Sequence, residues 1–585
     1  MVKVSDVIVQ YLKANNVEIV FGIIGSANSH IFNSILEEGS IKLVSVHHEQ
    51  AAVMAMGAYY RSTGKIAVAV VTAGGGAANA STGILSNWAD SIPGVIISGQ
   101  EQSYYLEDYK DMRMFGVQGY DAVKAYDGCT KMSQVITETN IHTLMPLSFA
   151  LTQQGRPGPV FLEIPFDTQS KMIEDEKAKV TPITEISPDI VSDTDYIRST
   201  LLQAERPVIL GGHGVKLAKA EESFREFIKE YNIPTLLSWS AVDLLDDNDP
   251  NYFGRPGVQG QRAANFIVQN SDLLIVLGSR LSLLQTGYRR EDFAPNANII
   301  HVDIDDAEIR KFKGKNIKAD VKYILEELNL FEKLTKPSIE EWRQYCNRTK
   351  EKYPLVMPEH LADPTNSYTF IDKFSQKVPD NYTIVTDMGT ALLSGFYGWR
   401  IKPNQKMFTS LGLGEMGYGL AAALGAGFGD RPVMCLNCDG GMMMNIQELQ
   451  TIKTHNLPVK IIIFNNDGYL MIKHTQKMLF KGARTCVDKA TGVTLPNYKK
   501  VAHAFDFEYF TEDKVDDFLA FEGQAIMEVF MSPDQEFIPK VRGMKLEDNT
   551  IQAGLLEEMS PLLPLEEVEQ AMVTGVNQRS KTAIR

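Results

Sequence analysis

The chain has 585 residues, of which 44% are hydrophobic and 22% charged, so most of its length has the composition of a folded globular protein. Its 58 basic and 73 acidic side chains leave a net charge of −15, which argues against a nucleic-acid binder, because such proteins are usually basic. Five cysteines are too few for a disulfide scaffold and indicate a reducing compartment, so we expect a cytoplasmic protein. The sequence has no signal-peptide core and no apolar stretch of about 18 residues, so no membrane contact is predicted.

Short apolar runs alternate with helical patterns along almost the whole chain. Eight runs have the pattern of buried strands: residues 65–73, 94–100, 158–165, 206–212, 271–279, 298–305, 431–439 and 460–466. Buried strands separated by helices predict parallel sheets with helices on both faces. We therefore expect an α/β protein made of doubly wound parallel-sheet domains.

Two segments rich in proline and charge, 177–189 and 350–366, are typical of domain linkers. They divide the chain into domains 1–180, 185–345 and 360–545, each of a size suited to one doubly wound sheet, and a tail, 546–585. The tail holds an amphipathic segment, LLEEMSPLLPLEEVEQAM. It either covers an active site or packs on the body of the protein, and packing is favoured.

One glycine-rich segment has two interpretations. Gly412, Gly414 and Gly417 satisfy the pattern G-x-G-x-x-G before a helix, and the acidic Asp439 follows after the next strand, as in a dinucleotide-binding fingerprint. The match is weak alone, because the chain contains 44 glycines. A dehydrogenase of that kind would turn over NAD(P)H without magnesium.

The segment that follows favours a different ligand. Asp439, Gly440 and Gly441 come at the end of a strand and open a helix, where bare N–H groups and the helix dipole bind phosphate. The carboxylate would repel a phosphate unless a hard cation lies between them, and Mg²⁺ prefers oxygen ligands such as those of Asp439 and Asn466. Asn466 ends the next strand, so one strand–helix–strand unit brings the two side chains together.

This order, in which Asp-Gly is followed by a helix and then by Asn-Asn, resembles the diphosphate motif of thiamine-diphosphate-dependent enzymes. The surrounding LGLGEMGYGLAAALGAGFGDRPV and NLPVKIIIFNNDGY are similar to the acetolactate synthase branch of that family. The resemblance covers roughly residues 1–540 and implies pyrimidine-binding, middle and diphosphate-binding domains. It implies that Asp439, Asn466 and the carbonyl of Gly468 bind the metal, and that Met416 wedges the cofactor into a bent shape. Further cofactor contacts implied in this domain are Gly389, Gly414, Gly440, Gly441 and Met471.

The amino-terminal domain carries the residues that the resemblance assigns to the pyrimidine ring. Glu49 begins a helix after the strand KLVSV, and it matches the glutamate that promotes proton exchange at the ring so that the cofactor becomes a nucleophile. Gly25 lies in a family turn, and Ala73, Gly75 and Asn79 lie in a loop similar to the family's Ser-Gly-Pro-Gly-x-x-Asn. Gln118 matches an active-site glutamine, and we expect Glu49 and Gln118 to be catalytic.

Several positions depart from the family pattern. Cys438 replaces a glycine, and with Cys435 it forms C-x-x-C, which we interpret as two small residues of a buried strand. Thr390 and Ala391, after Gly389, stand where Gly-Gln-His often contacts the diphosphate. Val117 and Gly119 replace a phenylalanine and a glutamate beside Gln118, and we expect them to open space for an acceptor.

The middle domain resembles the FAD-binding domain of acetolactate synthases in IVQNSDLLIVLGSRLSLLQTG and NIIHVDIDDAEI. Related enzymes keep this fold with no flavin or with another nucleotide. The resemblance implies FAD, which need not transfer electrons. It places the contacts at Gly212, Gly278, Arg280, Thr286, Asp303, Asp305 and Asp320.

The resemblance implies a decarboxylating carboligase. Such an enzyme takes an acetyl-type enamine from pyruvate, a 2-keto acid, and adds it to an aldehyde or ketone acceptor. Met471 and Ile472 suit a small donor, Thr475 stands where acetolactate synthases carry a tryptophan, and Lys473 and His474 either meet an anionic acceptor or are solvated. The pattern is closest to carboligases that act on a nucleotide-activated deoxysugar ketone.

Three alternatives remain open: an acetolactate synthase, a flavin-linked pyruvate oxidase and a sulfoacetaldehyde acetyltransferase-like enzyme. In this family Glu49 and the diphosphate motif meet across a subunit interface, which implies a homodimer or homotetramer.

Overall fold

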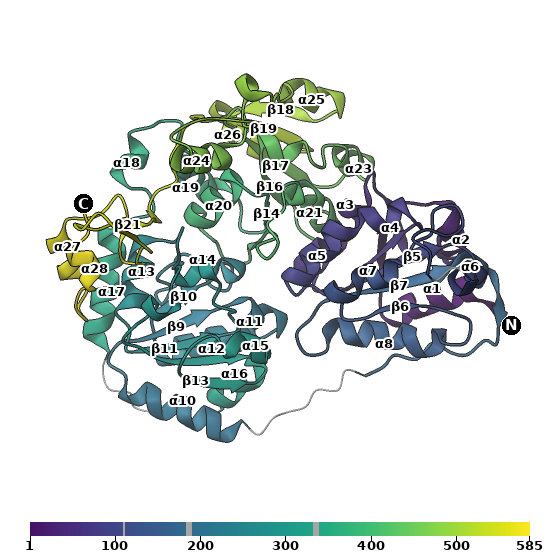
Figure 1. The fold of residues 1–585 in the computed structure, drawn as a ribbon, viewed down its shortest axis with the longest axis horizontal. Coiled ribbons are helices and arrows are strands. Elements are labelled where there is room, and N and C mark those ends of the chain that lie inside the picture. The colour runs from purple at the N-terminus through teal and green to yellow at the C-terminus, as the bar shows by residue number, and fades with distance from the viewer. Residues whose placement is uncertain (109–110, 183–189, 331–338) are drawn as a thin grey trace. The chain divides into compact units, whose positions relative to one another are not determined.

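The computed structural model describes residues 1–108, 111–182, 190–330 and 339–585 (Figure 1). These residues form two compact units. The first combines Met1–Glu185, Asn381–Leu392 and Lys406–Pro533, and the second combines Ile186–Asp380, Leu393–Gln405 and Asp534–Arg585. The expected α/β class with three parallel sheets is confirmed, two sheets in the first unit and one in the second.

The amino-terminal sheet of the first unit has the strand order β3-β2-β4-β5-β7-β6, with every pair parallel. Its strands are β2 (Ile19–Gly22), β3 (Lys42–Ser45), β4 (Val68–Val71), β5 (Gly94–Gln100), β6 (Ser133–Val135) and β7 (Pro159–Pro165). Alternate residues of the central strands face opposite sides, as the pleat requires. One face packs on α1 (Val4–Ala14), α2 (Ser29–Glu38) and α8 (Ile141–Gln153), and the other packs on α3 (Glu49–Thr63) and α5 (Ser81–Ala89).

The second sheet of this unit repeats the same topology, with the order β15-β14-β16-β17-β19-β18. Its strands are β14 (Thr383–Thr386), β15 (Lys406–Phe408), β16 (Val433–Cys438), β17 (Val459–Asn465), β18 (Glu508–Thr511) and β19 (Ala525–Phe530). Helices α21 (Tyr418–Ala426), α23 (Glu448–Thr454), α24 (Leu470–Leu479) and α25 (Tyr498–Ala504) belong to this part of the chain.

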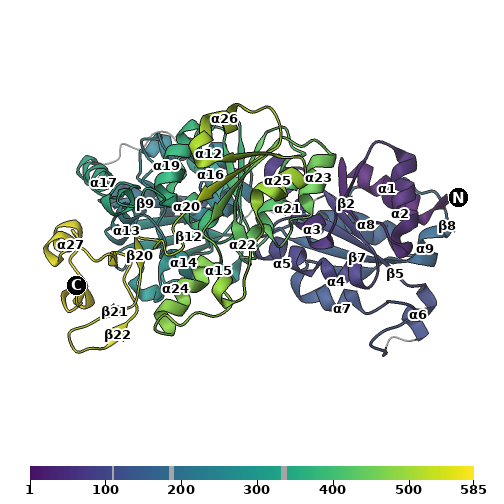
Figure 2. The same ribbon diagram turned by 90° about the horizontal axis from the view of Figure 1, so that it is seen from above.

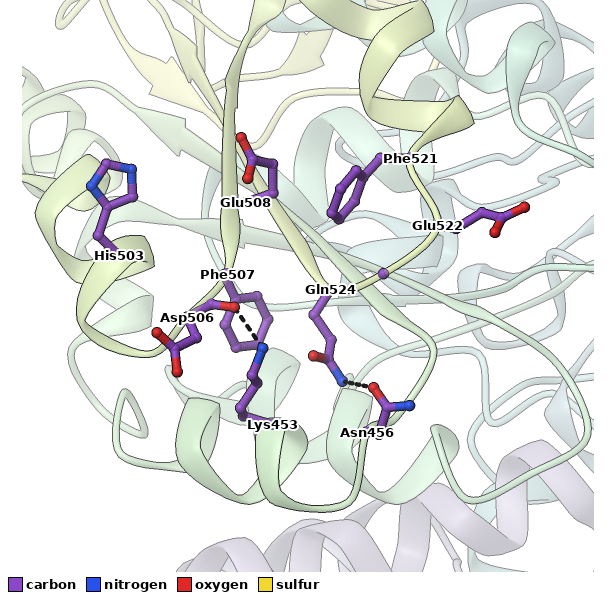
Figure 3. A pocket seen from close by; sticks show the side chains of 10 residues that line it. Lys453, Asn456, His503, Asp506, Phe507, Glu508, Phe521, Glu522 and Gln524 are labelled. Atoms are coloured by element: carbon purple, nitrogen blue, oxygen red, sulfur yellow. Dashed lines mark hydrogen bonds between the residues drawn. The ribbon is translucent and has the colours of Figure 1, made fainter.

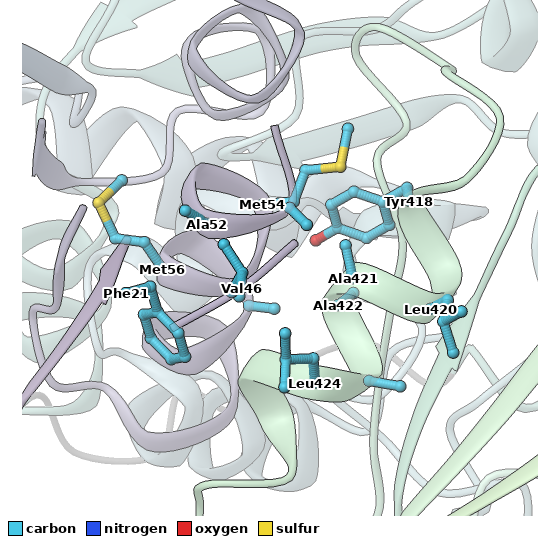
Figure 4. Close-up of a cluster of buried hydrophobic side chains, with 14 of the residues drawn as sticks. Phe21, Val46, Ala52, Met54, Met56, Tyr418, Leu420, Ala421, Ala422 and Leu424 are labelled. Atoms are coloured by element: carbon cyan, nitrogen blue, oxygen red, sulfur yellow. The ribbon is translucent and has the colours of Figure 1, made fainter. Parts of the chain in front are cut away.

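Helices α3 and α21 join the two sheets of the first unit into one hydrophobic core (Figures 2 and 4). Both helices are rich in alanine and glycine, which lets their backbones approach closely. A Cβ on Gly425 of α21 would lie 2.1 Å from the carbonyl oxygen of Ala55 in α3. Phe21, Val46 and Leu424 pack around the crossing.

The sheet of the second unit has the order β10-β9-β11-β12-β13 and is also parallel. Its strands are β9 (Pro207–Gly211), β10 (Thr235–Leu237), β11 (Leu273–Leu277), β12 (Asn298–Asp303) and β13 (Lys315–Lys318). Helices α10 (Val191–Gln203), α12 (Glu221–Tyr231) and α16 (Val321–Asn329) cover one face, and α13 (Arg262–Gln269) and α17 (Glu340–Lys352) cover the other.

The tail packs on the second unit, in agreement with the favoured interpretation. It contains α27 (Leu565–Ala571), α28 (Gln578–Lys581) and the short strands β22 (Ile551–Gln552) and β23 (Met559–Ser560). These strands pair antiparallel with β21 (Met544–Lys545) and β20 (Lys540–Val541), which directly precede the tail. Polar side chains of α13 hold it: Asn265 Nδ2 donates to the carbonyl of Leu556 at 2.9 Å, and Gln269 Nε2 donates to Glu557 at 2.8 Å. The next residue, Asn270, donates to the carbonyl of Ala571 at 2.9 Å.

All eight predicted strands exist, each within a few residues of its expected bounds. Residues 183–189 of the expected linker 177–189 lie outside the described residues. The other expected linker, 350–366, contains the end of α17 and α18 (Pro358–Leu361), because its prolines begin and separate short helices.

Candidate active site

Each of the three sheets has a topological switch point, which is a pair of neighbouring strands whose following connections lead toward opposite edges of the sheet. Ligands of open α/β sheets bind at the carboxyl ends of such strands. The switch points lie between β2 and β4, between β14 and β16, and between β9 and β11. The predicted site residues follow these strands: Gly25 and Ala73 in the first sheet, Gly389 and Asp439 in the next, Gly212 and Gly278 in the third.

Glu49 is the first residue of α3 and is only 8% exposed. Asn79 donates from Nδ2 to Oε2 of Glu49 at 2.9 Å, and a Cβ on Gly76 would lie 3.4 Å from Oε1. Gly25 lies against the loop from the other side, because its Cβ would meet Thr72. The structure therefore brings Glu49, Asn79 and the glycine loop together, as predicted.

Gln118 reaches the same loop. Its Nε2 donates to the carbonyl of Ala73 at 2.9 Å, and Gly74 has a φ of +64° that lets its backbone pass close to Gln118. Val117 is 91% exposed. The expected open space beside Gly119 is absent, because a Cβ there would lie 2.5 Å from Phe115 and 2.7 Å from Glu101.

Asp439 is fully buried at the end of β16, and its carboxylate accepts hydrogen bonds from three backbone N–H groups. Oδ1 accepts from Gly440 at 2.7 Å, and Oδ2 accepts from Asn466 at 3.0 Å and from Gly468 at 3.1 Å. Burial raises the pKa of Asp439 to about 6, and the three N–H groups lower it. These bonds join the ends of β16 and β17, as the spacing predicted.

The residues around Asp439 fit a magnesium ion. Within the described part of the chain, Oδ1 of Asn466 is buried without a hydrogen-bond partner, although Asn466 is only 3% exposed. Such an orphaned oxygen is costly unless a ligand satisfies it. Gly468 has a φ of +136°, and a Cβ there would lie 2.1 Å from the carbonyl oxygen of Val487, so the turn requires glycine. The expected oxygen ligands are therefore present.

A second buried polar atom without a partner, on Thr390, suits a phosphate oxygen. Thr390 is the first residue of α20 (Thr390–Gly398), and its Oγ1 is buried without a partner among the described residues. Cys438 is engaged elsewhere: its Sγ accepts from the N–H of Ala391 and donates to the carbonyl of Met388, both at 3.2 Å. The cysteines are free, and burial raises the pKa of Cys435 and of Cys438. This agrees with the interpretation of C-x-x-C as part of a buried strand.

The loop that carries Met416 is held by an aspartate that sequence reasoning missed. Asp387 follows β14 and accepts from the N–H of Gly417 with both carboxylate oxygens, at 2.9 and 3.0 Å. Gly414 and Gly417 have positive φ values of +76° and +88°, which the turn needs. Met416 is 39% exposed, and its methyl group would lie 3.5 Å from a Cβ on Gly440. An acid at a strand end was the available signal.

Two contacts connect the segment around Glu49 with the segment that follows Asp439 within the first unit. The N–H of His47 donates to Glu448 at 2.9 Å, and Gln50 Nε2 donates to Oδ1 of Asn445 at 2.9 Å. Neither Glu448 nor Asn445 was predicted, since they lie in mid-domain segments with no motif. The neighbours of Glu49 are thus anchored on the segment that follows Asp439.

Near the expected donor pocket, Met471 is partly buried and Lys473 is 5% exposed on α24. The Nζ of Lys473 points inward, 3.4 Å from the carbonyl oxygen of Asn466 and 3.3 Å from that of Asp467. Lys473 is therefore not a solvated side chain, and its charge lies behind the metal loop.

Of the predicted nucleotide residues of the second unit, the structure brings Gly212 and Gly278 together. A Cβ on Gly212 would lie 2.3 Å from the carbonyl oxygen of Gly278, so the ends of β9 and β11 touch. Asp305 and Asp320 cap helices by accepting from the N–H groups of Ala307 and Lys322. Asp303 accepts from the N–H of Asp305, and Arg280 is exposed.

A separate cavity of about 530 Å³ lies at the amino ends of β18 and β19, away from the carboxyl ends that carry the site (Figure 3). Lys453 Nζ donates to the carbonyl of Asp506 there, at 2.7 Å. Its lining comprises Lys453, Asn456, His503, Asp506, Phe507, Glu508, Phe521, Glu522, Gly523 and Gln524. None of the predicted site residues lines it.

Two features are absent from the described residues. No three His, Cys, Asp or Glu side chains gather in a way that could hold a metal, so a metal here would need amide and carbonyl ligands. No helix in the described ranges has both the length and the apolar character needed to span a bilayer.

Three family models of thiamine pyrophosphate enzymes match the chain. The N-terminal TPP binding domain matches residues 2–114, the central domain 195–328, and the C-terminal TPP binding domain 387–532. The isozyme 1 large subunit of acetolactate synthase from Escherichia coli K12 is 32% identical over 518 residues, 86% of this chain and 88% of the relative. The isozyme 2 large subunit is 31% identical over 515 residues, covering 85% and 88%.

A relative outside the bacteria is equally similar. The probable acetolactate synthase large subunit of Methanococcus aeolicus is 31% identical over 531 residues, 86% of each chain. The sheets, their switch points and these matches agree, and the chain therefore belongs to the thiamine pyrophosphate enzymes, as an acetolactate synthase-like enzyme that depends on thiamine diphosphate.

Proposed function

We propose that this enzyme is a decarboxylating carboligase that takes an acetyl unit from pyruvate and joins it to an aldehyde or ketone acceptor. The observation that carries the proposal is the orphaned, buried Oδ1 of Asn466 beside the carboxylate of Asp439, which suits a magnesium-bound diphosphate. In this proposal Asp439, Asn466 and the carbonyl of Gly468 hold Mg²⁺. Bound thiamine diphosphate supplies the nucleophilic carbon, and Glu49 exchanges a proton at the pyrimidine ring.

The remaining side chains have roles that follow from their positions. Gln118 and Asn79 line the pyrimidine side, while Met416 and Met471 contact the cofactor beside the diphosphate. Further cofactor contacts proposed are Gly25, Ala73, Gly75, Gly389, Gly414, Gly440 and Gly441. A dry pocket favours loss of CO₂, because it removes water from the carboxylate of the donor. The corresponding domains are 1–180, 185–345 and 360–545, with 546–585 as a tail.

We propose a nucleotide-activated deoxysugar ketone as the acceptor. Thr475 supports this choice, because it leaves room where a tryptophan would select a small 2-keto acid. Acetolactate synthesis is the second candidate, and the names of the relatives favour it.

FAD is a further proposal, for the second unit. Oε1 of Gln259 and Nε2 of Gln285 are buried without partners in the described ranges, on either side of Gly257, so a ligand with polar edges fits there. Contacts are proposed at Gly212, Gly278, Arg280, Asp303 and Asp320. Visible flavin absorbance of the purified protein would support this assignment, and its absence after reconstitution with FAD would refute it.

We further propose that the enzyme is a homodimer or homotetramer and that it lies in the cytoplasm. Leu413, Met416, Met443 and Met444 are 39–42% exposed beside the diphosphate motif, which suits cover by a second copy. The absence of disulfides suits a reducing compartment. Light scattering of the holoenzyme measures the oligomeric state.

The deciding experiment gives the enzyme thiamine diphosphate, Mg²⁺ and ¹³C-labelled pyruvate with a panel of ketones and aldehydes. Release of CO₂ and a labelled product two carbons heavier than one acceptor are expected. Failure to release CO₂ from pyruvate or from any other 2-keto acid would overturn the proposal. Acetolactate as the sole product would select the second candidate.

A further inference from the structure

The segment 115–119 forms a tight turn at the edge of the amino-terminal domain. Phe115 and Gly119 exchange two backbone hydrogen bonds, each 2.9 Å long. Val117 lies at the tip of this turn and is exposed. Gln118 follows, and its side chain turns back to the carbonyl of Ala73.

A carboxylate from another element lies beneath this turn. Glu101 directly follows β5, and its Oε1 accepts a hydrogen bond of 3.0 Å from the N–H of Gln118. Gln100 adds two bonds: its Nε2 donates to the carbonyl of Tyr120, and its Oε1 accepts from the N–H of Glu101, both at 2.9 Å. Gln100 is 1% exposed, so this end of β5 is a fixed platform.

Two glycines make room for the Glu101 carboxylate. A Cβ on Gly116 would lie 2.6 Å from its Oε2, and a Cβ on Gly119 would lie 2.7 Å from its Cγ. Side chains at these two positions would therefore displace Glu101. The glycines and the carboxylate belong to one arrangement, in which the turn is held from below by a charged group.

We propose that Glu101 is a positioning residue that fixes Gln118 for transfer of the acetyl unit to the acceptor. The inference rests on the proposed carboligase activity and on the place of Gln118 beside the glycine loop. A hydrogen bond from a backbone N–H to a carboxylate is stronger than one to a neutral oxygen, so Glu101 adds a strong bond to the two backbone bonds within the turn. Without it, Gln118 loses its fixed geometry, while Glu49 and the metal site keep theirs.

The test compares Glu101→Ala with Glu101→Gln in the holoenzyme with pyruvate and the best acceptor of the panel. Each donor pyruvate releases one CO₂, and its two-carbon unit either joins the acceptor or takes up a proton and leaves as acetaldehyde. We expect Glu101→Ala to lower the ratio of coupled product to CO₂ roughly tenfold, the effect of losing one hydrogen bond to a charged group. The rate of CO₂ release should stay near that of the wild type. Glu101→Gln keeps an acceptor oxygen and should restore most of the ratio.

A second variant tests the same arrangement without touching Glu101. Gly119→Ala places a methyl group against Glu101 and Phe115 and should reproduce the effect of Glu101→Ala, whereas Gly128→Ala, with nothing within 4 Å, should not. An unchanged ratio in Glu101→Ala, or an equal fall in Glu101→Gln, would overturn the proposal. A wild-type enzyme that releases no CO₂ would instead refute the proposed function.

Discussion

The side-chain amide of Asn79 donates a 2.9 Å hydrogen bond to Oε2 of Glu49, which is the first residue of α3. Glu49 is only 8% exposed, so this bond and the start of α3 fix the direction in which its carboxylate points.

Glu49→Gln removes the proton acceptor but keeps the shape and the bond from Asn79. CO₂ release from pyruvate should fall about 10²- to 10⁴-fold, the usual contribution of a positioned acid–base group. The affinity for thiamine diphosphate, measured by fluorescence titration, should change little. The matched variant Glu37→Gln, on the exposed side of α2, should be active. Near-normal turnover of Glu49→Gln would refute the role.

Asp439→Asn should weaken magnesium-dependent binding of the cofactor, because an amide replaces the only carboxylate of the proposed ligand set. Titration of the apoenzyme with Mg²⁺ and thiamine diphosphate measures the change, and chelation should release the cofactor from the wild type. Asp467→Asn is the control, since Asp467 is exposed next to the same loop. Equal magnesium dependence in both variants would contradict the assignment.

Glu415 gives a prediction about pH. The pKa of Glu415 is raised to about 7, and burial is the main cause. The negative charge of Asp90 also raises this pKa, while hydrogen bonds to Ser410 and Ser86 lower it. Its Oε2 accepts from Ser410 at 2.6 Å, while Oε1 is buried without a partner among the described residues. Because the folded protein holds this proton more tightly than the unfolded chain, the contribution to stability is complete below the unfolded pKa and is lost as the pH rises to about 7.

Glu415→Gln should therefore gain stability relative to the wild type between pH 5 and pH 8, by up to about 3 kcal/mol, and should show no further gain above that range. Denaturant unfolding at several pH values measures the difference in free energy of unfolding between the variant and the wild type. Both proteins keep Asp387 and Asp439, so the titrations of these two groups cancel in that difference. A difference that does not vary with pH would show that Glu415 is not protonated in the folded protein at neutral pH.

Gly425→Ala should destabilise the first unit by about 1–3 kcal/mol, the usual cost of overpacking, because the new methyl group would overlap the carbonyl of Ala55. Thermal unfolding with and without cofactor measures the loss. Cofactor affinity should fall as well, since α3 begins at Glu49 and α21 begins just after Met416. If Gly425→Ala is as stable as Gly128→Ala, the two backbones are not in contact.

Much of the architecture follows from the sequence because the central strands are continuous apolar runs. The strands that the sequence did not predict are mostly short or at sheet edges: β13 reads KNIK, and the edge strand β18 reads EYFT and has no fully buried residue. Edge strands lack the apolar run that marks a buried one. The metal residues were predictable because Asp439 and Asn466 are separated by one strand–helix–strand unit.

The contacts that position the site were not predictable in the same way. Asp387 and Glu101 each lie at a strand end, which is a signal in itself, but they accept from backbone N–H groups of distant segments, and no residue type marks those partners. The space expected beside Gly119 is filled by Glu101, which comes from the end of another strand, β5, and could not be placed there from the sequence. The sequence left open whether Lys473 meets an anionic acceptor or is solvated, and the structure places its ammonium against two backbone carbonyls.

The tail has a consequence for synthesis of the protein. The polar side chains of α13 find their partners in residues 556–571, which leave the ribosome only after all strands of the three sheets. Until then, these amide side chains are hydrogen-bonded to water in place of the tail. The second unit therefore completes its fold only after residues 556–571 have been made.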